Sequence, residues 1–313
     1  MKLINKIILG VLLLGVVLVV ISLIFTKGNI VSSITDLQPA RTYQEVTETQ
    51  EINSYVFDLS IDDIEFYTST DGKLLIQYYD EEKPKYTYKY ENETVYFTYV
   101  RDAKNFNFFN FKKYVVKVYL PTNTITSLDC SVTTGDIKSY LNSLIVDKIE
   151  LNVTTGKIQV DNIRANEVKI VATTGDCELE NISGKTLKCT SSTGDVNMNG
   201  LTFNSIYIGL TTGRVEVGKV VCDDLTIHTS TGSINGDQLI AKDAKFNSSN
   251  GSINVKFSDS STNYSLVADT NTGNIRVSGT DINISTANHL AWGVGENSIQ
   301  AKASTGSISI KFN

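Results

Sequence analysis

The sequence predicts an all-β protein, a single-chain β-helix or β-solenoid with rungs of about 19 residues, preceded by one N-terminal transmembrane helix. Three observations predict it. A long uncharged apolar run lies near the N-terminus, a glycine-centred tetrapeptide recurs at a nearly constant step, and apolar residues alternate with polar ones on both sides of that tetrapeptide. Outside the apolar run, no stretch keeps the 3.6-residue spacing of an amphipathic helix, so strands are expected throughout.

The apolar run covers residues 7–25, IILGVLLLGVVLVVISLIF, and contains no charged residue. A membrane-spanning helix needs about 17 to 25 apolar residues, whereas the apolar part of a cleavable signal peptide has about 7 to 15. The length therefore favours a cytoplasmic tip and an uncleaved anchor within residues 1–27. Val31-Ser32-Ser33 remains as a weak small-residue cleavage site.

Charge predicts the orientation of this anchor. Lys2 and Lys6, together with the amino terminus, precede the apolar run, and only Lys27 follows it closely. The positive-inside rule then places the N-terminus in the cytoplasm and the solenoid outside the cell membrane. Leaving out these three lysines lowers the 28 basic residues of the chain to 25, against 34 acidic residues, so the exported part is acidic. Nucleic acid is a poor partner for such a surface.

Two segments precede the repeats. Residues 28–45 are polar and without periodicity, which is typical of a stalk or linker between a membrane and a domain. Residues 46–127 are rich in Tyr, Val and Phe, which are enriched in strands. We interpret them as irregular first rungs and a hairpin that cap the N-terminal end of the solenoid.

The regular repeat fills residues 128–313. Its tetrapeptides read TTGD, TTGK, TTGD, STGD, TTGR, STGS, SNGS, NTGN and STGS, and successive glycines lie 21, 19, 19, 19, 19, 19, 22 and 33 residues apart. A constant step of this kind marks a solenoid. The central glycines are Gly135, Gly156, Gly175, Gly194, Gly213, Gly232, Gly251, Gly273 and Gly306.

Each unit reads as two strands that meet at the glycine. Apolar residues recur with a period of two before and after it, which gives each strand one buried face. A further apolar column marks a third inward point where the coil returns, and it reads Ile163, Ile182, Leu201, Val220 and Leu239. Each unit is therefore predicted to form one rung, stacked on the next at a strand spacing of about 4.8 Å.

The tetrapeptide is predicted to be a corner of the coil. Glycine permits a positive φ that other residues disfavour, and the Thr or Ser before it can bond to the local backbone. A phosphate-binding loop would need G-x-x-x-x-G-K-[ST] ahead of a helix, and neither is present. The nine glycines are therefore structural turn residues.

The four cysteines are predicted to be free thiols. Cys130 and Cys189 share a column but lie three rungs apart, which is about 14 Å at the strand spacing. A disulfide needs Cα atoms within about 7 Å. Cys177 belongs to the strand opposite Cys189, and Cys222 lies near a rung corner.

Departures from the repeat gather at its two ends, and we expect any partner to engage an end. KNFNFFNFKK (residues 104–113) places phenylalanines beside lysines, and the 33-residue step holds a loop insertion at about 285–298. Both segments can also be read as caps that fold over the ends. Aromatic residues flanked by polar ones are the usual composition of binding hot spots. The candidate partner-binding residues are Phe106, Phe108, Phe109, Phe111 and Trp292.

The sequence predicts no catalytic residues, no metal site and no cofactor. His228 and His289 are the only histidines and lie in different structural contexts, so no histidine-based triad can be assembled. One column contains carboxylates that, on adjacent rungs, could bind a cation or act as acid and base. Basic residues share the column, which favours a solvated face; it reads Asp136, Lys157, Asp176, Asp195 and Arg214.

A family resemblance rests on the order of these features. A membrane anchor, an entry segment closing with V-Y-L-P (Val118–Pro121), serial [ST]-[TS]-G-[DKRS]-[IV] rungs and a terminal S-T-G-S-I follow one another. This order resembles the bacterial putative-adhesin β-strand-repeat family, and most of all its membrane-anchored, LiaG-like members from Gram-positive bacteria. The resemblance spans residues 45–313 and implies a solenoid without catalytic residues to carry over.

Together these features predict a single-pass, extracellular solenoid that acts as a non-catalytic binding or scaffolding module at the cell envelope. Its expected partners are the membrane, through the anchor, and an envelope protein or glycan. An envelope polysaccharide-active enzyme on a β-helix scaffold is the alternative.

Overall fold

The computed structural model describes residues 40–81, 85–100 and 113–313 of the chain. The expected anchor and the candidate residues Phe106, Phe108, Phe109 and Phe111 lie outside the described residues. In the part of the chain that is described, no helix is both long enough and apolar enough to cross a membrane.

The described chain is almost entirely β-structure. The N-terminal strands are β1 (Arg41–Glu48), β2 (Ser54–Leu59), β3 (Asp63–Thr68), β4 (Leu74–Glu81), β5 (Tyr86–Glu91), β6 (Thr94–Tyr99) and β7 (Val115–Leu120). The regular strands are β8 (Thr124–Thr134), β9 (Ile137–Tyr140), β10 (Leu144–Thr155), β11 (Ile158–Asp161), β12 (Ile163–Thr174), β13 (Cys177–Thr193), β14 (Val196–Thr212), β15 (Val215–Thr231), β16 (Ile234–Asn250) and β17 (Ile253–Phe257). A short 3-10 helix, η1 (Ser261–Asn263), is followed by β18 (Tyr264–Ser278), β19 (Asn283–Trp292), β20 (Asn297–Thr305) and β21 (Ile308–Lys311).

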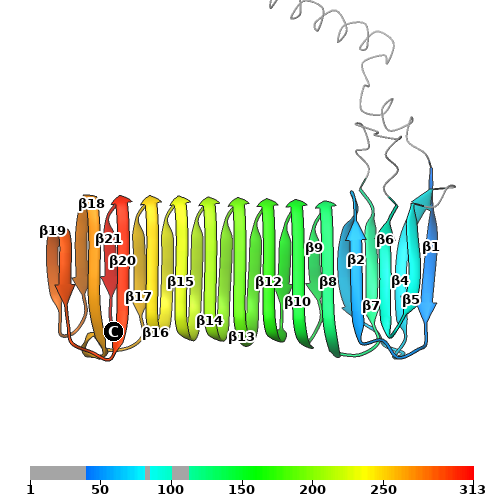
Figure 1. Ribbon diagram of the computed structural model, residues 1–313, viewed down its shortest axis with the longest axis horizontal. Coiled ribbons are helices and arrows are strands. Elements are labelled where there is room, and N and C mark those ends of the chain that lie inside the picture. The colour runs from blue at the N-terminus through cyan, green and yellow to red at the C-terminus, as the bar shows by residue number, and fades with distance from the viewer. Residues whose placement is uncertain (1–39, 82–84, 101–112) are drawn as a thin grey trace, which may run out of the picture.

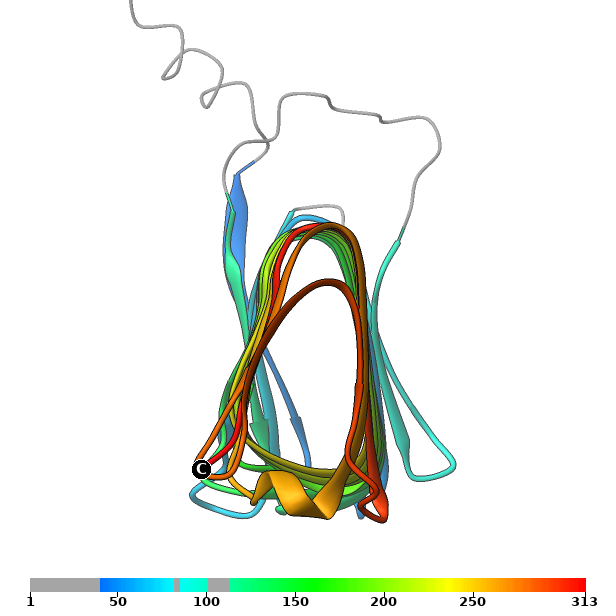
Figure 2. The same ribbon diagram turned by 90° about the vertical axis from the view of Figure 1, so that its left-hand side faces the viewer.

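These strands stack as the rungs of one solenoid, as predicted (Figure 1). The view along the molecule shows a narrow arch that closes on a base where η1 lies (Figure 2). In the middle of the stack each residue pairs in parallel with the residue 19 positions later, as in Leu187 with Ile206 and Ile206 with Leu225. The constant step in the sequence is therefore the length of one turn of the coil.

One hydrophobic core runs through the whole solenoid, from Ile52 to Phe312. The predicted inward columns fill it, because strands with a period of two turn every second side chain to the interior. The third inward column is also buried, with Ile182, Leu201 and Val220 each at most 1% exposed. Neighbouring rungs thus cover each other's apolar faces, which is how solenoids gain stability.

The corner glycines have two separate reasons to be glycine. All except Gly135 have φ between 136° and 156°, a range that residues with a Cβ rarely adopt. In addition, the corners stack backbone on backbone: a Cβ on Gly194 would lie 2.1 Å from the carbonyl oxygen of Gly175. The predicted positive φ is wrong for Gly135, whose φ is not in the positive range. A Cβ on Gly135 would still lie 2.5 Å from the carbonyl oxygen of Asp62.

The third inward column marks a corner where the coil returns, as predicted, but the left-handed backbone conformation at this second corner was not predicted. The residue before each member of the third inward column has φ between 52° and 70°, which is the left-handed region. This column contains several residue types, and it reads Asn162, Asn181, Gly200, Lys219 and Gln238. Asn and Gly tolerate this conformation best. At Lys219 and Gln238 the stacking of the rungs therefore holds the backbone in the left-handed region.

The column of aspartates has a structural role. The Oδ1 atom of Asp176 accepts a hydrogen bond from the backbone N–H of Asp195 at 2.8 Å, and Asp136 does the same for Lys157 at 2.9 Å. The first member of this ladder comes from the cap, where Asp63 accepts from the backbone of Asp136. The face is solvated, as predicted, but its carboxylates also bind the next rung.

The C-terminal end departs from chain order. β20 pairs with both β16 and β18, and β21 pairs with both β17 and β18. The last rung of the sequence therefore lies inside the stack, between the rung of β16 and β17 and that of β18. The segment expected as a loop at about 285–298 is largely strand β19, which pairs antiparallel with β18 and forms the end of the molecule (Figure 1).

The N-terminal end is built in the same way. β2 lies between β6 and β8, and β3 lies between β7 and β9, so the cap also inserts a rung out of chain order. β5 and β6 form the expected hairpin. Residues 41–45, expected in the stalk, instead belong to β1, which pairs antiparallel with β4.

All four cysteines are buried and unpaired in the structure. The thiols of Cys177 and Cys189 are hydrogen-bonded, and this contact, together with burial, raises the pKa of Cys189 well above its usual value. Burial likewise raises the pKa of Cys222 to about 12.

Candidate functional site: a tyrosine patch on the N-terminal cap

The outer face of the N-terminal cap carries a cluster of tyrosines, here called the tyrosine patch. Its members come from strands β1, β3, β4, β7 and β9 and from the residue before β7, and they are Tyr43, Tyr67, Tyr79, Tyr114, Tyr119 and Tyr140. Tyr43 is 47% exposed, Tyr79 39% and Tyr140 49%. Exposed aromatic residues that gather on one face of a cap mark a binding surface more often than isolated ones.

Three of these rings form a continuous stack across neighbouring strands. Tyr67 lies opposite Tyr119 of β7 and opposite Tyr140 of β9 in the register of the sheet. Its ring centroid is 5.2 Å from that of Tyr119 and 5.1 Å from that of Tyr140, and the ring planes differ by 22° and 16°. Such offset stacking between cross-strand aromatic residues stabilises the sheet and fixes the rings in place.

The other three rings form a second group on the same cap. Tyr79 stacks on Tyr114 at 5.0 Å and meets the edge of Tyr43 at 5.7 Å. The guanidinium of Arg41 lies 5.0 Å from the centroid of the Tyr114 ring, which is within the range of a cation–π contact. Tyr43 and Tyr79 are directly paired across β1 and β4.

A band of mixed charge separates the two groups of rings. In register across the sheet, Glu65 lies opposite both Lys117 and Lys138, and Gln77 lies opposite both Lys117 and Glu45. Gln77 Nε2 donates to Glu45 at 3.1 Å. The patch thus offers aromatic rings beside alternating hydrogen-bond donors and acceptors.

Two phenols of the patch, those of Tyr43 and Tyr67, have raised pKa values. A hydrogen bond to the carboxylate of Glu45 raises the pKa of Tyr43 to about 12. Burial, followed by a hydrogen bond from its hydroxyl to Glu65 at 2.6 Å, raises the pKa of Tyr67. Both hydroxyls therefore stay neutral.

A buried ion pair holds the base of the patch. Arg41 Nη1 donates to Asp62 Oδ2 at 2.6 Å, and the side chains are only 4% and 1% exposed. The Tyr86 hydroxyl donates to the same oxygen at 2.6 Å, and the backbone N–H of Tyr114 donates to Asp62 Oδ1 at 3.1 Å. Burial lowers the pKa of Arg41, but the charge and hydrogen bond of Asp62 outweigh it, so the net shift is upward. The pair ties β1 to the rest of the cap.

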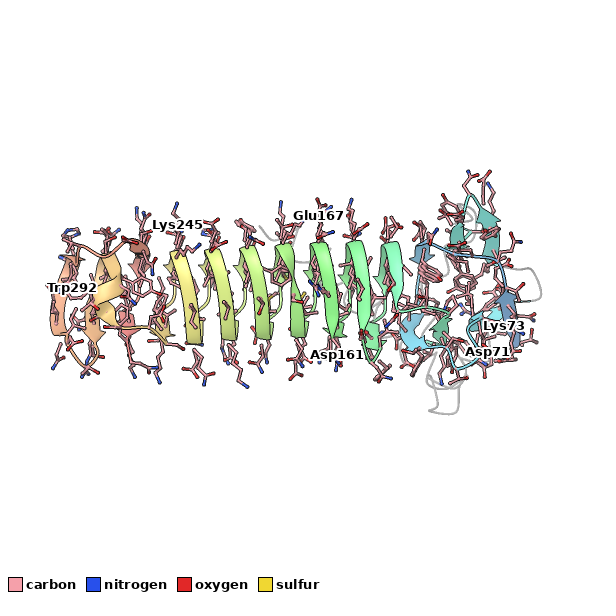
Figure 3. All side chains as sticks on the ribbon, turned by 90° about the horizontal axis from the view of Figure 1, so that it is seen from below. Asp71, Lys73, Asp161, Glu167, Lys245 and Trp292 are labelled. Atoms are coloured by element: carbon pink, nitrogen blue, oxygen red, sulfur yellow. The ribbon has the colours of Figure 1, made fainter. Side chains whose placement is uncertain are left out.

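The partner-binding residues expected from the sequence are not the tyrosines of the patch. Trp292 is half-buried and packs against the core at the far end of the molecule, opposite Asp71 and Lys73 of the cap (Figure 3). The tyrosines were missed because Tyr67, Tyr119 and Tyr140 are far apart in the chain and are brought together only by strand insertion. The one available signal was the frequency of tyrosine among residues 46–127.

The two histidines lie on different strands, β15 and β19, of the described ranges. No group of three His, Cys, Asp or Glu side chains there is placed to hold a metal ion. His289 Nδ1 lies 2.6 Å from Asp269 Oδ1 on the exposed C-terminal strands. His228 lines a shallow groove of about 310 Å³ on one wall, together with Tyr207 and Gly209.

Solved structures resemble this fold. A putative adhesin from Parabacteroides distasonis has a TM-score of 0.52 at 10% identity, covering 88% of this chain and 98% of that chain. A putative adhesin from Bacteroides fragilis has a TM-score of 0.46 at 16% identity, covering 88% and 100%. No curated protein matches the chain.

The sequence pattern of one family spans nearly all of the solenoid. Residues 52–311 match the Toastrack DUF4097 family. This match starts just before β2 and ends with β21, so it includes both inserted rungs. The solved structure from Parabacteroides distasonis shares the fold of this chain. The chain belongs to the Toastrack DUF4097 family.

Proposed function

We propose that the protein is an extracytoplasmic, single-pass membrane protein whose solenoid acts as a non-catalytic binding module at the bacterial cell envelope, with the tyrosine patch as its binding surface. The observation that carries this proposal is the patch itself, in which three exposed rings and three half-buried rings are held in place by stacking on the cap where the chain enters the fold. Residues 7–25 supply the apolar segment for an anchor, as in LiaG-like proteins. Relatives described as putative adhesins support a binding role.

The composition of the patch favours an envelope glycan as its ligand. Tyrosines combine an apolar ring face with a polar hydroxyl, and the neighbouring Glu65, Lys117 and Gln77 offer hydrogen bonds to ring hydroxyls. An anionic lipid surface is a weaker candidate, because membrane-surface contacts rely on clustered Lys and Arg. The patch mixes both signs of charge, and the chain has a net charge of −6.

The experiment compares two variants of the full-length protein in detergent micelles, bound to purified cell-wall glycan. Replacing Tyr67 and Tyr140 by Ser removes two rings of the stack and is expected to weaken binding about tenfold or more, as for hot-spot aromatic residues. Tyr207→Ser is the control, because Tyr207 is exposed, at 39% against 49% for Tyr140, but lies on the regular wall.

Two results would count against the proposal. Equal binding by both variants would remove the patch as the ligand site. Release of reducing ends from the glycan by the unmodified protein would show catalysis in place of simple binding.

A further inference from the structure

The solenoid ends on an open strand edge. β19 pairs with β18 along one side, from Asn283 to Trp292. No other strand of the described chain pairs with β19, so its outer backbone N–H and C=O groups lack partners in the sheet. Figure 1 shows β19 as the outermost strand at that end. Such an edge is a template for pairing with another strand.

This edge differs in charge from the edges at the opposite end. β1 and β5 each pair with a single strand and carry the charged residues Arg41, Glu45, Glu48, Lys89 and Glu91. β19 reads NISTANHLAW, and its only titratable side chain is His289. Charged residues on an edge strand hinder pairing between molecules, so the N-terminal edges are protected and the C-terminal edge is not.

The burial pattern of β19 is symmetric about one residue. Asn288 has a φ of 70° and forms the corner at which the strand bends. The flanking residues at equal distances from it have matching burial: Ala287 and His289 are exposed, and the next residues out on each side are half-buried. The half-buried residues are Ile284, Thr286, Leu290 and Trp292.

We infer that β19 is the interface of a tail-to-tail dimer, in which two copies of the chain pair edge to edge about a two-fold axis through Asn288. An interface of this kind requires that residue i contact residue j and j contact i. Because the chain runs up one arm of the arch and down the other, rotation about this axis makes the strands antiparallel on both arms.

The symmetric register places half-buried residues opposite half-buried ones and exposed residues opposite exposed ones. Ile284 of one copy lies opposite Trp292 of the other, and Thr286 lies opposite Leu290, so the half-buried side chains meet on the core side. Ser285 lies opposite Ala291 on the solvent side. Val294, two residues beyond the strand, is fully exposed at 100%. No pair in the register brings like charges together.

The inference is tested by a disulfide that only this register allows. In full-length protein purified in detergent micelles, Ser285→Cys combined with Ala291→Cys places two thiols opposite each other on each arm. Antiparallel partners have Cα atoms about 4.5 to 5.5 Å apart, which permits a disulfide. We expect a covalent dimer under mild oxidation, seen by non-reducing electrophoresis.

The two single variants are the matched controls. Ser285→Cys alone, or Ala291→Cys alone, places its thiol on the opposite arm from its symmetry mate, so each is expected to stay uncrosslinked. The native cysteines are buried and do not contribute. Absence of the covalent dimer in the double variant, or equal crosslinking in a single variant, overturns the inference.

A second measurement uses charge. Ser285→Lys with Ala291→Lys places like charges opposite each other and is expected to raise the dimer dissociation constant at least tenfold in analytical ultracentrifugation. Thr42→Lys with Gln44→Lys on β1 adds the same charge to the protected edge and is expected to change nothing. The inference is overturned if the unmodified protein stays monomeric across the concentration series. It is overturned equally if that monomer accepts an added peptide strand at β19. Glycan binding by the patch is measured separately and is independent of this result.

Discussion

The Oδ1 atom of Asp195 accepts a hydrogen bond from the backbone N–H of Arg214, on the next rung, at 2.8 Å. This contact turns an exposed carboxylate into a link between two rungs. Asp195→Ala removes the acceptor and leaves that amide to water, so we expect a loss of about 0.5 to 1.5 kcal/mol in the free energy of unfolding. Asp195→Asn keeps a carbonyl oxygen at the same place and is expected to lose much less. Denaturant unfolding measures the free energy of unfolding of both variants. Equal losses in the two would show that the hydrogen bond from Arg214 to Asp195 does not stabilise the stack.

The stacking of the corners predicts a larger effect at Gly194. A Cβ there would lie 2.1 Å from the carbonyl oxygen of Gly175, and its φ is 136°, so Gly194→Ala must move backbone. We expect the free energy of unfolding to fall by more than about 2 kcal/mol, because a strained backbone position alone costs about 1 to 3 kcal/mol. The matched control is Gly218→Ala, where the nearest atom is Asn199 Oδ1 at 3.1 Å, the end of a side chain that can turn away. Similar melting temperatures for the two variants would contradict this account.

The regular rungs were predictable because their signals are local in the chain. The corner at Gly194 and the buried Leu201 both follow from spacing within a single unit, and neighbouring units repeat it. The left-handed conformation at the second corner escaped prediction because Asn181, Lys219 and Gln238 share it without sharing a residue type. Only the stack imposes it.

The two ends were not predictable for a different reason. A rung motif such as STGS before β21 is the same whether that rung ends the stack or lies inside it, so the sequence carries no signal for the insertion of β20 and β21. The tyrosine patch depends on the same long-range register. Tyr67 meets Tyr119 and Tyr140 only because β3 is inserted between β7 and β9.

The buried thiols predict chemical inertness. Burial raises the pKa of Cys130 well above its usual value, so its reactive thiolate is scarce at neutral pH. We expect slow alkylation of the folded protein and four alkyl groups after denaturation without a reducing agent, as measured by intact mass. A denatured sample that takes up only two groups would reveal a disulfide, for which Cys177 and Cys189 are the pair already in contact.

Asp161 predicts an unusual pH dependence. Burial, followed by the charge of Glu180, raises the pKa of Asp161 above 3.8, and its Oδ1 is buried without a hydrogen-bond partner among the described residues. A raised folded-state pKa gives stability that is full below the unfolded pKa and is lost as pH rises through the folded pKa. Asp161→Asn is therefore expected to raise the melting temperature at pH 7, with the gain shrinking toward pH 4 and below.

Asp223 supplies the control with the opposite sign. A hydrogen bond from Lys242 lowers the pKa of Asp223 below 3.8, so its contribution is present above the unfolded pKa and is lost as pH falls through the folded pKa. Asp223→Asn is expected to lower the melting temperature slightly at pH 7 and not at all in acid. If both variants shift the melting temperature in the same direction at pH 7, the assignment of Asp161 is wrong.

The ion pair of Arg41 and Asp62 predicts how the first strand is held. Arg41→Met leaves the carboxylate of Asp62 buried with only the Tyr86 hydroxyl and the Tyr114 amide as donors. Removing one partner of a buried pair costs about 3 to 5 kcal/mol. Because β1 contacts the fold mainly through β4, this loss is expected to appear as local opening of β1, measured as faster hydrogen exchange of the β1 and β4 amides.

The exposed pair of Lys89 and Glu91 is the matched control, since its side chains are 63% and 51% exposed and such pairs contribute little. Lys89→Met is expected to leave hydrogen exchange in β5 and β6 unchanged. Arg41→Met is also expected to weaken glycan binding by the tyrosine patch, because Arg41 lies against the ring of Tyr114, and Tyr114 stacks on Tyr79. Glycan binding and β1 exchange should therefore change together in this variant. Unchanged exchange in β1 would mean that strand pairing with β4 holds it without the ion pair.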